Sequence, residues 1–294
     1  MTKTRLAAFA LLGVGFAWGA AFVLMKDAIE QQPYMDFLAT RFTLAAIVMA
    51  ALRPNVSKNF AKGDISIGLL LGLVLSLGFI TQTIGLELTT AATSGFLTGL
   101  YVVITPLLAW LFLKKSVGWR IGIGAAVSLV GLAIFSGAAE TTEFQLGQIW
   151  LIVCAFLYAL HILLLGKFGS GRNTYRFAMV QIVGVAAVCW GFALRDGYQP
   201  PHNFTVWFAV IFTAVASTAL AFWVQTWAQT ILDSSRAALL MTSEVLFTAI
   251  IAIGLGQEAL TLAIGLGGAL MVAAMLVVEW PSNKEKIALE PHVF

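Results

Sequence analysis

Long apolar segments alternate with short polar connections from one end of the chain to the other. Each apolar segment is close to the roughly 20 residues that an α-helix needs to cross the ~30 Å hydrocarbon core of a bilayer. Ten such segments can be counted, at about 5–25, 34–52, 65–86, 92–113, 118–136, 146–165, 174–194, 204–226, 235–256 and 261–279. In lipid they must be helices, because an open sheet would leave backbone groups without hydrogen bonds. The pattern therefore predicts an all-α membrane protein with ten transmembrane helices.

Composition points to the same class of protein. Hydrophobic residues make up 60% of the chain and charged residues 11%, whereas about a quarter of the residues of a soluble domain are charged. The two cysteines, Cys154 and Cys189, each lie inside an apolar segment. A buried free thiol is more common in such a place than a disulfide or a metal ligand. We therefore expect the lipid bilayer to surround most of the chain.

Positive charges gather on one side of the predicted membrane. Ten crossings place both termini on the same side, and we take this side to be the cytoplasm. It then holds 14 of the 17 lysines and arginines, namely Lys3, Arg5, Arg53, Lys58, Lys62, Lys114, Lys115, Arg120, Lys167, Arg172, Arg176, Arg236, Lys284 and Lys286. Cytoplasmic loops of membrane proteins carry an excess of Lys and Arg. The distribution therefore predicts that both termini are cytoplasmic.

Residues 222–269 repeat residues 79–126 at an offset of 143 positions, with eleven identities. The identical pairs include Phe79 and Phe222, Gln82 and Gln225, Thr105 and Thr248, and Gly122 and Gly265. We expect two copies of one five-helix unit, at 1–140 and 141–282, followed by a cytoplasmic tail at 283–294. Because five is odd, the second copy enters the membrane in the opposite direction. Inverted repeats of this kind are typical of secondary transporters, whose substrate sites lie between the two copies.

Glu244 is the leading candidate for a functional residue. It lies near the middle of the ninth apolar segment, and its partner in the repeat is Tyr101, in the middle of the fourth. An ionisable group within a membrane span is costly and usually functional. Glu244 could bind a proton, a cation or the amine of a substrate. The alternative is a carboxyl group that is hydrogen-bonded to its neighbours for packing alone.

Arg41 is the second candidate, about two helical turns into the second segment. Either a substrate carboxylate or Glu244 would be a natural partner for its guanidinium group. The alternative is that the long side chain extends to the membrane surface. The approximate counterpart of Arg41 in the second half is Gln181, which is polar but uncharged.

Weaker candidates are the aromatic and amide side chains within the segments. Trp18 and Tyr158 could line a cavity, although membrane Trp and Tyr residues more often lie at the interface. Gln82 and Gln225 could be gate residues or could form simple hydrogen bonds between helices. His161 is more easily explained as a packed group than as a proton relay.

The sequence lacks the motifs that identify several other classes of protein. The sequence has no Gly-rich phosphate loop followed by Lys and Ser or Thr, no His-Glu-x-x-His, and no cluster of cysteines and histidines. No basic domain suggests nucleic-acid binding. We therefore expect no enzyme activity, no cofactor and no metal site. A lipid-modifying membrane enzyme and a non-transporting scaffold are the other classes that we considered.

The chain resembles the drug/metabolite transporter superfamily, specifically its ten-helix EamA type. The resemblance covers about residues 5–280. The residues that carry it are Trp18-Gly19, Arg41, Thr105-Pro106, Glu244, Gly256-Gln257-Glu258, Gly265, Gly267 and Gly268. The resemblance implies alternating access around a central cavity and export of amino acids or other small metabolites from bacteria.

These expectations combine into one hypothesis. The chain is expected to be a secondary transporter of the bacterial inner membrane that exports amino acids, aromatic ones among them, or similar small metabolites. The alternatives are a multidrug exporter of cationic or aromatic compounds and a relative that carries nucleotide sugars. Transport could be either facilitated or coupled to protons, because Glu244 permits coupling without requiring it, and no nucleic acid is expected to bind. The residues expected to bind substrate are Trp18, Arg41, Gln82, Tyr101, Tyr158 and Glu244.

Overall fold

The structure is a computed structural model that describes residues 2–57, 60–89, 91–114, 118–135, 146–195, 197–256 and 259–280. Within these ranges every regular element is a helix. Several predictions fall on residues outside the described ranges. These are the boundary between 140 and 141, the tail 283–294, the family residues Gln257 and Glu258, and the lysines Lys58, Lys115, Lys284 and Lys286.

The first half of the chain crosses the bundle five times. Its helices are α1 (Lys3–Ile29), α2 (Tyr34–Leu52), α3 (Asp64–Leu88), α4 (Ala91–Gly99), α5 (Tyr101–Leu113) and α6 (Trp119–Phe135), with a short 3₁₀ turn at Pro54–Ser57. The fourth crossing is shared by α4 and α5, which meet at Leu100.

The second half also crosses five times. Its elements are α7 (Leu146–Phe168), α8 (Thr174–Ala193), α9 (Phe204–Ala214), the π-helical turn η2 (Val215–Leu220), α10 (Ala221–Ala228), α11 (Ser234–Met241), α12 (Ser243–Gly254) and α13 (Leu262–Glu279). The eighth crossing joins α9, η2 and α10, and the ninth joins α11 and α12. Since five crossings separate α1 from α7, the two halves enter the bundle from opposite ends.

The predicted fold class is confirmed. By length and composition, nine helical segments of the described chain can cross a membrane, and the helix at Trp119–Ile134 is apolar but shorter. Together they match the ten predicted segments and form two inverted five-helix repeats. Cys154 and Cys189 are free and buried, as their apolar context predicts.

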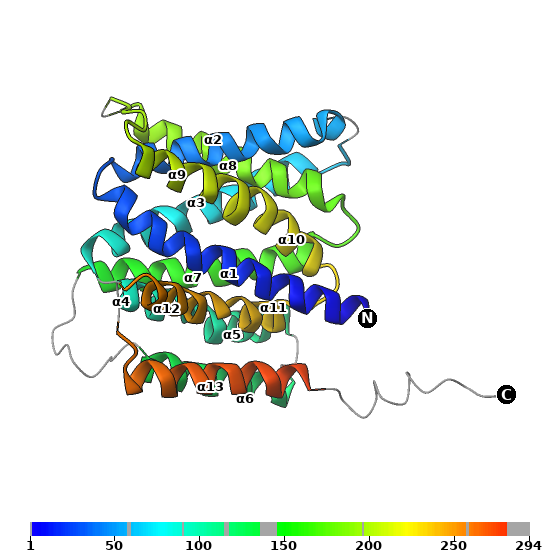
Figure 1. Ribbon diagram of the computed structural model, residues 1–294. Helices are drawn as coiled ribbons and strands as arrows, with labels where there is room; N and C mark the ends of the chain where they lie inside the picture. The colour runs from blue at the N-terminus through cyan, green and yellow to red at the C-terminus, as the bar shows by residue number, and fades with distance from the viewer. Residues whose placement is uncertain are drawn as a thin grey trace.

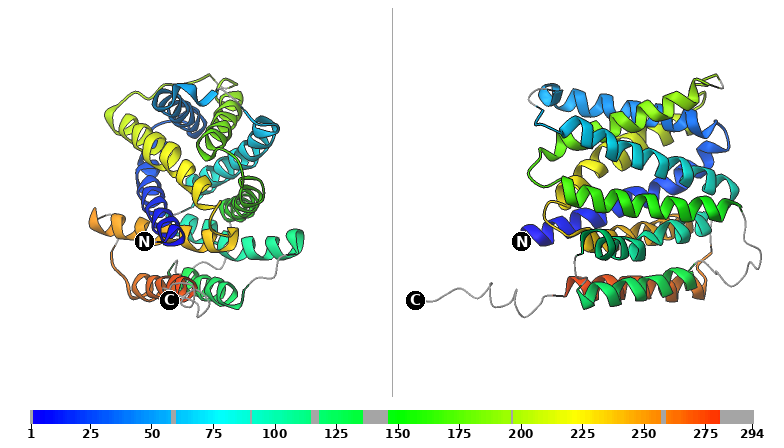
Figure 2. Two further views of the ribbon diagram at one scale, coloured as in Figure 1. Left: turned by 90° about the vertical axis from the view of Figure 1, so that its right-hand side faces the viewer. Right: turned by 180° about the vertical axis from the view of Figure 1, so that it is seen from behind.

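The arrangement of the helices places α1 at the centre of the molecule. α1 runs diagonally between a layer that contains α2, α3, α8 and α9 and a layer that contains α4, α5, α11 and α12 (Figure 1). The pair α6 and α13 lies at one edge of the bundle in every view (Figure 2). The N-terminus and the end of α13 lie at the same end of the bundle, as an even number of crossings requires.

Charged side chains form ion pairs at the end of the bundle where α1 begins. Arg172, just before α8, pairs with Asp64 at the start of α3. Arg236 in α11 forms two hydrogen bonds of 2.6 and 2.7 Å with the carboxylate of Glu279 at the end of α13. Each pair ties together helices that are distant in the sequence.

Local irregularities occur in three of the predicted segments, each of which still forms one membrane-spanning helical segment. The segments 92–113 and 235–256 each contain a one-residue turn, at Leu100 and at Thr242, and these positions are related by the repeat within one residue. The segment 204–226 contains the π-helical turn. Pro106 lies inside α5, six residues after Leu100.

Close packing of α1 against α12 depends on the absence of a side chain at Gly19. A Cβ atom there would lie 2.7 Å from the backbone nitrogen of Thr248 and 2.8 Å from the carbonyl oxygen of Glu244. We expect Gly19→Ala to lower the free energy of unfolding by about 1–3 kcal/mol, because a backbone neighbour would have to move. Gly13→Ala is the matched control, since Gly13 has nothing within 4 Å of that position. Thermal unfolding in detergent should show a lower midpoint for Gly19→Ala alone; equal midpoints would contradict this packing.

Candidate functional site

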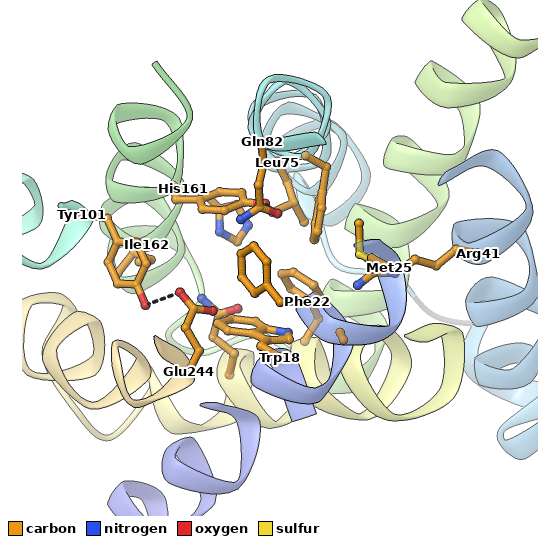
Figure 3. A pocket seen from close by; sticks show the side chains of 15 residues that line it. Trp18, Phe22, Met25, Arg41, Leu75, Gln82, Tyr101, His161, Ile162 and Glu244 are labelled. Atoms are coloured by element: carbon orange, nitrogen blue, oxygen red, sulfur yellow. Dashed lines mark hydrogen bonds between the residues drawn. The ribbon is translucent and has the colours of Figure 1, made fainter. Parts of the chain in front are cut away.

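A cavity lies beside α1, where helices of both repeats meet (Figure 3). The cavity has a volume of about 50 Å³. Its walls are formed by Trp18, Ala21, Phe22, Met25, Arg41, Leu75, Phe79, Gln82, Tyr101, Tyr158, His161, Ile162, Phe222, Gln225 and Glu244. All six side chains that the sequence nominated for substrate binding are among them. The structure thus brings them together, and their role in binding remains a prediction.

Tyr101 and Glu244 are joined directly across the repeat. The Tyr101 hydroxyl donates a hydrogen bond of 3.1 Å to Glu244 Oε1 (Figure 3). Tyr101 is the first residue of α5 and Glu244 is the second residue of α12, so each follows closely on one of the two one-residue turns. The repeat therefore explains both the equivalent positions of the two residues and their contact.

The Glu244 carboxyl group is buried in the cavity wall. Glu244 is 5% exposed and, among the described residues, forms no ion pair with Lys or Arg.

Arg41 is buried in the cavity wall without an acidic partner in the described chain. Its Nε donates to Thr218 Oγ1 at 2.8 Å and its Nη2 to Ser217 Oγ at 3.3 Å. Its Nη1 lies 3.1 Å from the sulfur atom of Met25. The guanidinium carbon also lies 5.1 Å from the centre of the Phe79 ring. All these contacts are with neutral groups.

Two of the alternatives for Arg41 are thus excluded in this conformation. Its side chain is 1% exposed and does not extend to the membrane surface. Glu244 is not its partner either, because the two side chains lie on opposite sides of the cavity with Phe22 between them (Figure 3). The remaining expectation for Arg41 is a substrate carboxylate.

The π-helical turn supplies the hydroxyl groups that hold Arg41. A π-helical turn leaves the regular α-helical hydrogen bonding, and such turns often mark functional sites. The indole nitrogen of Trp18 donates to the carbonyl oxygen of Ser217 at 2.9 Å. Arg41 and Trp18 therefore attach α2 and α1 to the same turn.

The other polar residues of the wall form pairs of their own. The Tyr158 hydroxyl donates to Gln82 Oε1 at 3.0 Å. His161 Nε2 lies 2.8 Å from Oε1 of Gln181, the approximate counterpart of Arg41. Sequence reasoning gave His161 little weight, and the structure places it in the cavity wall beside this glutamine.

Sequence reasoning missed part of the aromatic wall. Phe222 lies 6.0 Å from Phe79 and 5.7 Å from Trp18, measured between ring centres. The repeat could have indicated Phe222, because it aligns Phe222 with Phe79, another aromatic residue of the cavity wall. Phe22 and Met25 had no comparable signal, since neither stands out among the apolar residues of the first segment.

The cavity wall combines one carboxyl group, one guanidinium group and one imidazole with mostly apolar side chains. It contains no cluster of three or more His, Cys, Asp or Glu residues among the positions described. Its geometry suits the reversible binding of a small molecule with both charged and apolar parts.

Comparisons with known proteins agree with this architecture. The EamA-like transporter family matches residues 5–137 and again residues 145–280. Two proteins of Archaeoglobus fulgidus, each described as an uncharacterized transporter, are similar to the chain. One is 28% identical over 266 residues, which cover 90% of this chain and 83% of the relative. The other is 24% identical over 273 residues, which cover 88% and 92%.

A protein of known crystal structure has the same fold. The alignment has a TM-score of 0.79 and covers 92% of this chain and 97% of the other. With 17% sequence identity, this likeness concerns the fold alone.

Proposed function

This chain belongs to the EamA-like transporter family, and from this premise we propose that it exports amino acids, aromatic ones among them, or similar small metabolites. It is a multi-pass membrane protein that moves small molecules. We further propose that it works in the bacterial inner membrane with both termini in the cytoplasm. The two repeats would rock around the cavity in alternating access, without a catalytic step.

The observation that carries this proposal is the separation of Arg41 from Glu244. A buried ion without a counter-ion is costly in a membrane, where charged groups normally pair. Here an acid and a base line the same cavity without contact. A molecule with an ammonium group and a carboxylate group could satisfy both of them at once. Amino acids are the most common small molecules with this pair of groups.

The size of the cavity defines the conformational state that is required. A single water molecule needs about 10–15 Å³ of such volume, so 50 Å³ accommodates only a few water molecules. An amino acid with a large side chain needs more space. Binding of such an amino acid would therefore require movement of the repeats.

Counterflow in proteoliposomes tests the proposal. Vesicles with purified protein are loaded with unlabelled leucine, phenylalanine, lysine or glutamate and exposed to the labelled form. We expect saturable exchange of at least one of these amino acids, with competition among related ones. Tetraphenylphosphonium and a nucleotide sugar serve as comparison substrates. Exchange of these compounds and of no amino acid would refute amino-acid export in favour of one of the alternatives.

A further inference from the structure

A chain of amide hydrogen bonds determines how Gln225 is oriented. Gln229 Nε2 donates to the carbonyl oxygen of Ile162 at 2.8 Å. A carbonyl oxygen can only accept, so the amide of Gln229 has one possible orientation. Its Oε1 then accepts from Gln225 Nε2 at 3.1 Å. The amide of Gln225 is thereby oriented as well.

This orientation leaves one acceptor without a donor. Gln225 Oε1 is buried and has no hydrogen-bond partner, and the residue is 1% exposed. An unpaired buried acceptor destabilises the protein, because it has lost its hydrogen bonds to water without replacement. Because Gln225 lines the cavity, a donor on a bound molecule is the natural way to satisfy it.

Gln225 and Glu244 line the same cavity. Two groups that hold them are also in its wall: Ile162, which anchors the amide chain, and Tyr101, which donates to Glu244. Arg41 instead contacts Thr218, seven residues before Gln225, a distance on the order of 10 Å along a helix. The cavity wall therefore offers two side-chain acceptors, Gln225 and Glu244, to the N–H groups of a bound molecule.

We propose that Gln225 and Glu244 together bind the N–H groups of a primary ammonium group, so that the cavity distinguishes a primary ammonium from a fully methylated one. The inference rests on the proposed function and names the chemical group that the site selects. An ammonium group offers three N–H donors, whereas a trimethylammonium group has the same charge and none. A site made only of aromatic faces would accept the methylated cation at least as well.

The repeat provides a matched control for Gln225. Its counterpart Gln82 also lines the cavity, but Gln82 Oε1 already accepts the Tyr158 hydroxyl. Gln82→Met should therefore weaken the binding of both kinds of cation by the same factor. Gln225→Met removes the unpaired acceptor and should weaken the binding of the primary ammonium selectively.

Counterflow with phenylalanine and N,N,N-trimethylphenylalanine tests the inference. In the wild type we expect phenylalanine to be preferred by about tenfold or more, the effect of one hydrogen bond to a charged group. Gln225→Met should reduce this preference about tenfold, and Gln82→Met should leave the ratio unchanged while both rates fall. Equal exchange of the two forms by the wild type, or an unchanged ratio in a folded Gln225→Met, would overturn the inference and leave amino-acid export standing.

A second measurement separates the inference from the proposed function. The midpoint of thermal unfolding of the purified protein is measured in the presence of butylammonium chloride or of butyltrimethylammonium chloride. We expect butylammonium to raise the wild-type midpoint more, and the difference to disappear in Gln225→Met. This result without phenylalanine exchange would support the ammonium site and refute the export of phenylalanine. Equal midpoints of the wild type with both salts would refute the ammonium site.

Discussion

Replacement of Arg41 by glutamine is expected to raise the half-saturation concentration for phenylalanine about ten- to a hundredfold. A hydrogen bond to a charged group contributes about 1.5–3 kcal/mol, and each 1.4 kcal/mol is a factor of ten in affinity. The guanidinium group is the one cation in the described cavity wall, so its loss removes the partner of the substrate carboxylate. The measurement is counterflow over a range of phenylalanine concentrations.

The folding of this variant can be anticipated from the surroundings of Arg41. Its hydrogen bonds go to Thr218 and Ser217, and it has no acidic partner among the described residues. Removing it therefore leaves no opposite charge unpaired, and we expect the protein to fold. Arg41→Lys retains the charge but loses the planar fork of donors, so its affinity should lie between those of wild type and Arg41→Gln. An unchanged half-saturation concentration in Arg41→Gln would exclude a role in binding the carboxylate.

Replacement of Glu244 by glutamine is expected to abolish accumulation of substrate driven by a pH gradient. Glutamine has nearly the same size and can still accept the hydrogen bond from Tyr101, but it cannot carry a proton. With substrate near saturation on both sides, exchange should continue in this variant, because exchange requires no net proton movement. Comparison of uptake with and without an imposed pH gradient, in the same vesicles, measures the effect.

Tyr101→Phe is the control for the local structure around Glu244. It removes the hydroxyl donor and retains the carboxyl group, so gradient-driven accumulation should continue at a reduced rate. If Glu244→Gln instead accumulates substrate in response to the gradient as the wild type does, Glu244 is not the coupling residue. The carboxyl group would then serve only to bind the substrate amine.

The sequence alone was sufficient to predict the fold. The length of the apolar segments and the side preference of Lys and Arg depend on the bilayer as a solvent, and the internal repeat relates five-segment units to each other. These constraints act on whole segments, so they tolerate errors of a few residues. The bounds predicted for α2 are those of the structure. The one-residue turns at Leu100 and Thr242 were missed, because a change of one residue does not alter the apolar character of a whole segment.

The site could be predicted only in part. Glu244 and Arg41 were nominated because a charged residue within an apolar segment is conspicuous, and Tyr101 was nominated from its place in the repeat; the structure places all three in one cavity wall. The hydrogen-bond partners of Arg41 could not be predicted from the sequence, because neutral hydroxyl groups such as that of Thr218 are common in membrane helices. Gln225 Oε1 is left unpaired because of a series of hydrogen bonds that runs from Gln225 through Gln229 to the carbonyl oxygen of Ile162. No rule of residue spacing predicts such a series.

The most direct test of the account is to measure whether one molecule is bound by Arg41 and Glu244 at the same time. Equilibrium binding of phenylalanine, phenylethylamine and phenylpropionate to the purified protein compares ligands that have both charged groups, only the ammonium or only the carboxylate. We predict that the wild type prefers phenylalanine to both others. Arg41→Gln should lose its preference for phenylalanine over phenylethylamine, and Glu244→Gln should lose its preference over phenylpropionate. If both variants keep the wild-type order of affinities, the two residues do not form the substrate site.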